Sequence, residues 1–156
     1  MDARIVWQNG MSFETQIRTH RFIQDAKLEH GGKDLGPTPK ELLLASVIGC
    51  TGMDVVSLMT KMRAGFTACE VEAQAETIKT HPQIFDHIDV HFKVTGGAEL
   101  KNDVIVKAVK MSLTKYCGVS AMVDATSPIK FKIFANGQLI ESGEADFSEA
   151  MAAGSP

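Results

Sequence analysis

The sequence is poor in the features that stabilise very small or secreted domains. It has only three cysteines among 156 residues, namely Cys50, Cys69 and Cys117. A chain of this length can bury about two thirds of the surface that its unfolded form exposes. We therefore expect a fold that needs neither a disulfide nor a metal ion for its stability, and no cofactor is predicted.

The sequence also lacks several targeting and partner signals. The net charge is −3 without a cluster of Lys and Arg, which argues against a nucleic-acid or anionic-membrane partner. Only three apolar residues follow Arg4 before Gln8, too few for a signal peptide. The longest apolar run, residues 42–53, ends at Asp54 and is shorter than the roughly 20 residues of a membrane span. We expect a cytoplasmic protein, in which thiols stay reduced and a disulfide is transient and catalytic.

The composition is that of an ordinary globular protein, with 44% hydrophobic and 22% charged residues. We predict a single domain over residues 1–147 and a flexible C-terminal tail over residues 148–156. The order of the expected elements gives an α+β fold. Short strands are expected first, at residues 3–7 and in a hairpin of residues 13–18 and 21–25, followed by a polar loop over residues 29–36.

A long helix is predicted to begin at Thr38. Thr38 is a good N-cap, Pro39 suits the first helical position, and Glu41 follows Thr38 by three residues, which completes a capping box. This helix is expected to run to about Met62 and to stop at Gly65.

The remainder of the chain alternates between strands and helices. Residues 69–77 alternate strictly between apolar and polar side chains, which is typical of a half-buried strand. Residues 88–94 form the returning strand. Helices are expected over residues 100–116 and 119–125, and residues 129–134 and 138–142 form a hairpin around Asn136-Gly137.

Cys50 lies in the apolar helix, and Cys117 lies at a predicted helix junction. Two thiols can perform redox chemistry together, one attacking and one resolving, only if the fold brings them side by side. A free cysteine in an apolar helix is by default a small core residue, and this alternative stays open for Cys50 and Cys117. Cys69 lies on the apolar face of a strand, so we expect it to be structural.

Two stretches carry a family resemblance: residues 36–42, Gly-Pro-Thr-Pro-Lys-Glu-Leu, with Cys50 near the middle of the helix, and residues 116–120, Tyr-Cys-Gly-Val-Ser. Together they resemble the OsmC/Ohr family over nearly the whole chain, to about Phe147. The resemblance implies antiparallel sheets packed around a central buried helix, in two chains that intertwine as a homodimer with each active site at the interface. It also implies reduction of organic or hydrogen peroxides by two cysteines, with electrons from a small dithiol, lipoyl in some members.

Within this resemblance, Cys50 is the expected nucleophile and Cys117 the resolving thiol. Gly49 and Gly52 beside Cys50 would leave room for a substrate to approach its sulfur. Attack on a peroxide would give a sulfenic acid, which condenses with a nearby thiol to a disulfide. We expect the oxidised protein to contain a Cys50–Cys117 bridge and a free Cys69.

Glu41 is the third candidate catalytic residue. In the family, a glutamate at the start of this helix pairs with an arginine that orients the peroxide, but it stands ten residues before the first cysteine, where this chain has Lys40. Glu41 stands nine before, and its capping-box role already accounts for its presence. The candidate cations in the preceding segment are Arg18, Arg21, His30 and Lys33.

Two other functions stay open beside the peroxidase. One is a binding protein that keeps the fold and an apolar pocket, and the other is a thiol redox sensor whose disulfide signals without turnover. His87, Asp89 and His91 share one strand face at a spacing that could hold a metal ion. A solvated or dimer-facing surface is the preferred interpretation of these three residues, so no metal site is assigned.

Overall fold

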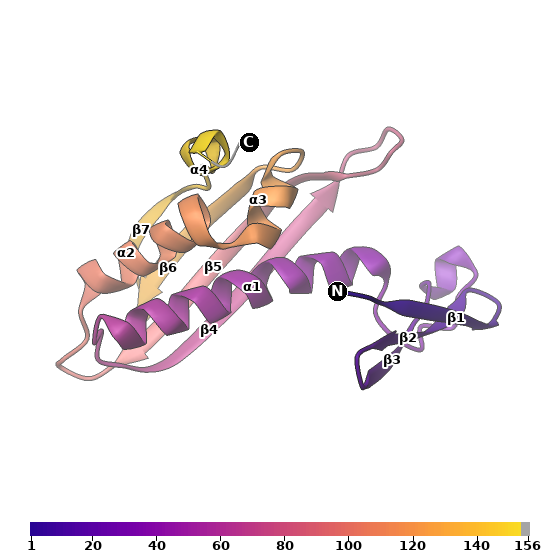
Figure 1. Ribbon diagram of the computed structural model, residues 1–156, viewed down its shortest axis with the longest axis horizontal. Helices are drawn as coiled ribbons and strands as arrows, with labels where there is room; N and C mark the ends of the chain where they lie inside the picture. The colour runs from indigo at the N-terminus through magenta and orange to yellow at the C-terminus, as the bar shows by residue number, and fades with distance from the viewer. Residues whose placement is uncertain (154–156) are drawn as a thin grey trace. The chain divides into compact units, whose positions relative to one another are not determined.

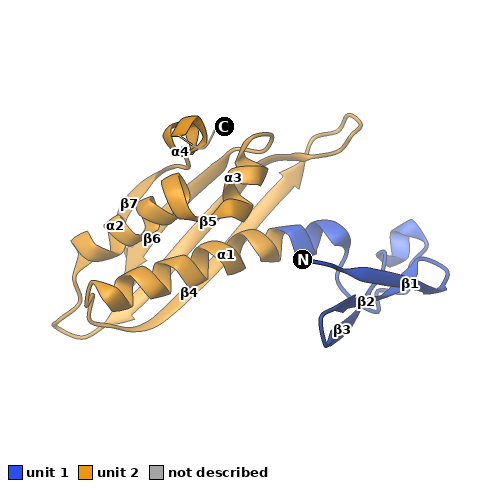
Figure 2. Cartoon of the chain, viewed as in Figure 1, with its two compact units in different colours: residues 1–43 blue, residues 44–156 orange. Residues whose placement is uncertain are grey.

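A computed structural model describes residues 1–153 of the chain, which form two compact units. Figure 2 colours them: the first unit comprises Met1–Leu43 and the second begins at Leu44. The domain predicted over residues 1–147 therefore contains two compact parts. Of the predicted tail, residues 148–153 form a short helix, and residues 154–156 lie outside the described residues.

The first unit contains a three-stranded antiparallel sheet in the order β1-β2-β3. Its strands are β1 (Arg4–Asn9), β2 (Ser12–Ile17) and β3 (His20–Gln24). The chain reverses between them at two tight turns, where Gly10 and Arg18 have positive φ angles of 56° and 55°. The predicted strand and hairpin are thus confirmed, and a 3-10 helix, Leu28–His30, follows.

A buried carboxylate organises the loop after β3. Asp25 accepts hydrogen bonds from the backbone amides of Ala26 (2.8 Å), Lys33 (3.0 Å) and Leu35 (3.3 Å). Burial opposes ionisation of this carboxyl, but the three amide donors and the nearby charge of Lys33 outweigh burial and lower its pKa. This loop is therefore fixed by hydrogen bonds to one side chain.

Helix α1 spans Pro39–Lys61, close to the predicted range. The capping box is present: the Thr38 amide and hydroxyl donate to Glu41 Oε2 at 2.8 and 2.9 Å, and the Glu41 amide donates back to Thr38 Oγ1 at 3.4 Å. The buried positions of α1 repeat every four residues, so a single stripe of the helix is enclosed. They are Val47, Thr51, Val55 and Met59.

The length and composition of α1 alone would allow it to cross a membrane. Its most apolar window has a mean hydropathy of 1.9, and 22% of that window is buried within the structure. The sequence expectation relied on the uninterrupted apolar run, which Asp54 ends, whereas the helix continues to Lys61. A helix that packs on a protein core passes the same test, so the absence of a membrane partner stays a prediction.

The second unit is built on a four-stranded sheet in the order β4-β5-β6-β7. Its strands are β4 (Phe66–Thr77), β5 (Phe85–Gly96), β6 (Ile129–Ala135) and β7 (Gln138–Glu144). The predicted antiparallel pairing is present for the other strand pairs of both sheets, whereas β5 and β6 pair in parallel. The long helical connection between these strands brings the chain back to the end of the sheet at which β5 begins, so β6 runs in the same direction.

Helices cover one face of this sheet, as Figure 1 shows for α1 and α2. The connection from β5 to β6 contains α2 (Asn102–Met111), a π-helical turn η2 (Ser112–Tyr116) and α3 (Gly118–Asp124), and α4 (Ser148–Ala153) follows β7. The helix predicted over residues 100–116 is therefore α-helical only to Met111. The core lies between these layers, where alternate residues of β5 such as Ile88, Val90 and Phe92 are completely enclosed.

Candidate functional site

The structure brings the sulfurs of Cys50 and Cys117 together. These two atoms and a carboxylate oxygen of Asp54 all lie within 4.8 Å of one another. Both cysteines are free thiols, with Cys50 half-buried and Cys117 completely enclosed. The expectation that the fold places these two thiols side by side is confirmed.

Two local features of the backbone position these groups. Cys50 and Asp54 are four residues apart on α1, so their side chains share one face of the helix. On the other side, the π-helical turn η2 ends where the Cys117 amide donates to the Ser112 carbonyl at 3.0 Å. The chain then becomes extended at Cys117 (φ −74°, ψ 95°) before α3 begins. Such single π turns inside helices are frequent at functional sites.

The Cys117 sulfur accepts two hydrogen bonds from Ser120. The Ser120 hydroxyl donates at 3.0 Å and its backbone amide at 3.3 Å. Burial raises the pKa of Cys117 to about 11, and the hydrogen bond and negative charge of the neighbouring Cys50 act in the same direction. The two donors of Ser120 favour the thiolate but do not offset burial. Cys117 is therefore a protonated thiol at neutral pH.

A chain of hydroxyl groups ends on Asp54. The Ser112 hydroxyl donates to Asp54 Oδ2 at 3.1 Å, and the hydroxyls of Thr51 and Ser112 are 2.8 Å apart. Because a serine hydroxyl has one proton, Thr51 must donate to Ser112 when Ser112 donates to the carboxylate. Thr51 and Ser112 are fully buried, so this chain fixes the Asp54 carboxylate relative to both thiols.

Cys69 lies apart from this group among the described residues. It is half-buried on β4, where it pairs with Val94 of β5 and packs against the core. Burial raises the pKa of its thiol, which disfavours the reactive anion. These observations support the structural role predicted for Cys69.

Glu41 has two sets of partners in the first unit. Besides the capping box with Thr38, its Oε1 atom lies 3.4 Å from Lys27 Nζ. The hydrogen bonds from the Thr38 amide and hydroxyl lower the pKa of Glu41, and Lys27 adds to this effect. Glu41 is therefore an anion paired with a lysine, a residue that was not among the predicted cations.

The predicted cations have other contacts. Arg21 of β3 pairs with Glu14 of β2 at 3.2 Å, and Arg18 forms the turn between these strands. His30 lies 3.6 Å from Glu29. The amide of Lys33 donates to Asp25 as part of the loop described above.

The histidine face of β5 contains local hydrogen bonds. His87 lies 2.8 Å from Asp86 and 3.1 Å from Asp89, whereas the His91 ring packs edge to face on Phe134 at 5.8 Å. Among the described residues, the side chains of metal-ligand type that meet at one point are instead those of Cys50, Asp54 and Cys117. The metal hypothesis for the histidine face therefore receives no support from this structure.

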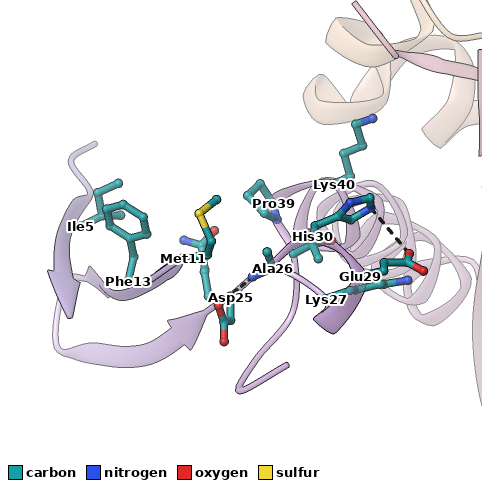
Figure 3. A pocket seen from close by; sticks show the side chains of 12 residues that line it. Ile5, Met11, Phe13, Asp25, Ala26, Lys27, Glu29, His30, Pro39 and Lys40 are labelled. Carbon is teal, nitrogen blue, oxygen red and sulfur yellow. Dashed lines mark hydrogen bonds and ion pairs between the residues drawn. The ribbon is translucent and has the colours of Figure 1, made fainter. Parts of the chain in front are cut away.

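The first unit also contains a pocket of about 570 Å³, which Figure 3 shows from close by. Apolar side chains lie along it, namely Ile5 and Phe13 of the sheet and Met11 of the turn between β1 and β2, and Pro39 lines it at the start of α1. Polar and charged residues join this lining, namely Asp25, Lys27, Glu29, His30 and Lys40. The volume is in the range of small-molecule sites.

Comparisons with known proteins agree with this architecture. The family model described as "OsmC-like protein" matches residues 31–132 of the chain. The chain belongs to the OsmC-like family. A curated relative of this OsmC-like chain, protein YhfA of Escherichia coli K12, is 35% identical over 125 residues, which are 80% of this chain and 90% of that protein.

Solved structures show the same fold. A hypothetical protein from Aquifex aeolicus has a TM-score of 0.76 at 24% identity, covering 86% of this chain and 95% of the other. An organic hydroperoxide resistance protein from Elizabethkingia anophelis has a TM-score of 0.60 at 17% identity, covering 85% and 92%. Both likenesses establish the fold of this OsmC-like chain.

Sequence reasoning missed four polar residues: Asp54, Ser112 and Ser120, which contact the thiol pair or one another, and Lys27, which pairs with Glu41. A helical spacing signal was available for Asp54, which follows Cys50 by one turn. Ser120 follows Cys117 by three residues, as a residue that bonds an N-cap does. Ser112 and Lys27 reach their partners through contacts distant in the sequence, so no local pattern indicates them.

Proposed function

We propose that this protein is a thiol-dependent peroxidase that reduces organic or hydrogen peroxides through Cys50 and Cys117. The observation that carries the proposal is the placement of the two sulfurs within 4.8 Å, with Cys50 half-buried and Cys117 enclosed. A peroxide can reach only the more accessible thiol, which assigns attack to Cys50 and resolution to Cys117. Membership of the OsmC-like family supports the substrate class, since proteins named for organic hydroperoxide resistance share this fold.

The proposed reaction has three steps. The Cys50 thiolate attacks the peroxide O–O bond, which gives a Cys50 sulfenic acid and an alkoxide that takes a proton and leaves as the alcohol. The Cys117 sulfur then attacks the sulfenic sulfur, which releases water and forms a disulfide. An external dithiol, small or lipoyl, reduces that disulfide by thiol–disulfide exchange.

The environment of Cys117 suits the second step. Its pKa is raised first by burial and then by the neighbouring Cys50. The two hydrogen bonds from Ser120 oppose this rise, because they favour the thiolate that attacks the sulfenic sulfur.

Glu41 is the anionic member of an ion pair. Its partner in this chain is Lys27, where the family resemblance implies an arginine. A lysine is a point charge without the planar fork of a guanidinium, so it would orient a peroxide less strictly. We therefore assign Glu41 and Lys27 a supporting role and expect their loss to slow turnover less than loss of Cys50.

Self-association as a homodimer is part of the proposal. Only 22% of the most apolar window of α1 is buried within the structure, and Met53 is 72% exposed. A large apolar surface that the chain itself leaves uncovered marks an interaction site. A second copy of this chain, as in the family, is the partner we assign to it.

A direct test is consumption of cumene hydroperoxide with dihydrolipoamide as the reductant. Turnover is expected from wild type and from the matched control Cys69→Ser, whereas Cys50→Ser should lose at least about 99% of it, because the attacking group is gone. Equal rates for wild type and Cys50→Ser would contradict the proposal. Disulfide formation without sustained turnover would identify a redox sensor instead.

The apolar pocket of the first unit favours a second candidate function, the binding of a small apolar ligand. The lining combines apolar side chains with both acidic and basic ones, so a ligand with an apolar body and one polar end would suit it. A fluorescent fatty-acid probe tests this function. Binding that is unchanged in Cys50→Ser and weakened in Phe13→Asp, with no peroxide consumed by wild type, would favour the binding protein over the peroxidase.

A further inference from the structure

Cys50, Asp54 and Cys117 offer three ligand atoms of the kinds that bind zinc. We propose that the reduced protein binds one Zn²⁺ per chain at this point, through the two thiolate sulfurs and one carboxylate oxygen. This inference goes beyond the proposed peroxidase activity, because it concerns the reduced protein in the absence of any peroxide.

The spacing of the ligand atoms fits a tetrahedral ion. Zn–S bonds of about 2.3 Å in tetrahedral geometry place two sulfurs about 3.8 Å apart, and a carboxylate oxygen lies slightly closer to each. The three atoms here all lie within 4.8 Å of one another. Closure around the ion therefore needs the two sulfurs to approach by about 1 Å or less and each sulfur–oxygen pair by about 1.3 Å or less, which small side-chain rotations supply.

The ligands come from ordered backbone. Cys50 and Asp54 occupy one face of α1 at a spacing of four residues, and Cys117 is held by the π-helical turn that ends at its amide. Cys117 is completely enclosed, whereas Cys50 and Asp54 are half-buried. An ion can thus enter from the side of Cys50 and Asp54 and be shielded by Cys117.

Outer hydrogen bonds hold two of the ligands, as in known zinc sites. The buried Ser112 hydroxyl donates to Asp54 Oδ2, and Ser120 donates both its amide and its hydroxyl to Cys117 Sγ. A neutral thiol is a weak acceptor, whereas a thiolate is a strong one. Two donors directed at one buried sulfur are therefore better matched to a metal-bound thiolate than to a thiol.

The charge balance also favours a divalent cation. Two thiolates and one carboxylate bring three negative charges to a region only 4.8 Å across. Binding of Zn²⁺ leaves a net charge of −1 and releases the two thiol protons to solvent. The fourth ligand position stays open for water or a small thiol. Because the ion occupies both sulfurs, Zn²⁺ and peroxide exclude each other at this site.

The experiment is a titration of reduced, chelator-treated protein with Zn²⁺ against a chromophoric competitor, repeated with Co²⁺ as a spectroscopic probe. Wild type and the matched control Cys69→Ser should bind one ion per chain, and Co²⁺ should show the near-ultraviolet absorption of thiolate ligation. Cys50→Ser and Cys117→Ser should each lose at least about 100-fold in affinity, and Asp54→Asn at least about tenfold.

Ser120→Ala keeps all three ligands and tests the outer hydrogen bonds, with an expected loss of about tenfold. Circular dichroism of each variant verifies folding. Absence of stoichiometric Zn²⁺ binding by folded wild type would overturn the proposal, as would equal affinity for wild type and Asp54→Asn. These readouts involve no peroxide, so their failure is distinguishable from failure of the proposed peroxidase function.

Discussion

The two sheets of the protein differ in what they bury. In the four-stranded sheet, alternate residues of β5 and β6 are enclosed apolar side chains, and the core cluster of the described residues lies entirely between Val47 and Ala135. In the three-stranded sheet, all six residues of β1 are exposed. The buried residues of the first unit are polar, namely Ser12, Thr15 and Asp25.

This difference separates two ways of making a stable structure. The second unit is stabilised by apolar burial and carries the thiol pair on helices packed against that core. The first unit is ordered by turns, by backbone pairing and by hydrogen bonds to Asp25. Its exposed apolar residues, including Ile5 (58%) and Trp7 (62%), remain available for contact with a partner.

The largest expected effect contrasts one isoleucine from each sheet. Ile88 on β5 is fully enclosed, whereas Ile5 on β1 is 58% exposed. Ile88→Ala should lower the free energy of unfolding by about 2–5 kcal/mol, because it removes buried methyl groups and leaves a cavity. Ile5→Ala should change it by about 0.5 kcal/mol or less. Urea denaturation measures both, and equal losses would show that the first sheet is covered in solution.

The second prediction concerns the buried thiol of the second unit. Since the pKa of Cys117 is raised to about 11, its thiolate fraction should rise about tenfold per pH unit below that value. The thiolate fraction at pH 9 should thus be about 100-fold that at pH 7. An NMR titration of protein with isotope-labelled cysteine follows Cys117 without a reagent that must enter the core, and a titration midpoint below pH 9 would contradict the assigned environment.

The third prediction concerns the apolar side of α1. Met53 on α1 and Met122 on α3 are each 72% exposed, which makes them a matched pair. Met53→Asp should weaken self-association at least about tenfold, because it places a charge in an apolar interface. Met122→Asp should leave the dimer intact. Sedimentation across a concentration series measures the self-association of both variants. If only Met122→Asp weakened it, the interface would involve α3 and not α1.

The smallest effect is expected at the start of α1. Thr38→Ala removes the side-chain half of the capping box and should lower the free energy of unfolding by about 1 kcal/mol. Thr38→Ser is the matched control, because it keeps the hydroxyl. If Thr38→Ala lowered the free energy of unfolding as much as Ile88→Ala does, the helix cap would contribute as much stability as a core residue. The contrast between the two units would then be wrong.

Local patterns in the sequence predicted most of the fold. The capping box of Thr38 and Glu41 fixed the start of α1, and strict alternation over residues 69–77 indicated the half-buried β4. The parallel pairing of β5 with β6 was missed, because it depends on where the intervening helices return the chain. The change from α-helix to π-helix after Met111 was also missed, since no residue pattern marks it.

The candidate site likewise contains residues that the sequence indicates and residues that only the folded structure reveals. Cys50 and Cys117 could be named because cysteines are few and the surrounding motifs resemble a family. Ser112 reaches Asp54 across 58 residues of sequence, and Lys27 reaches Glu41 from a loop. Such long-range polar contacts depend on the whole fold, and a single sequence does not reveal them.

The pairing of the cysteines after oxidation tests the central claim most directly. Reduced protein is treated with one equivalent of cumene hydroperoxide, the remaining thiols are blocked, and the peptides are mapped by mass spectrometry without reduction. We predict a disulfide between Cys50 and Cys117 within one chain, with Cys69 blocked as a free thiol. A bridge that includes Cys69, or an oxidised protein in which Cys50 stays a free thiol, would contradict the account.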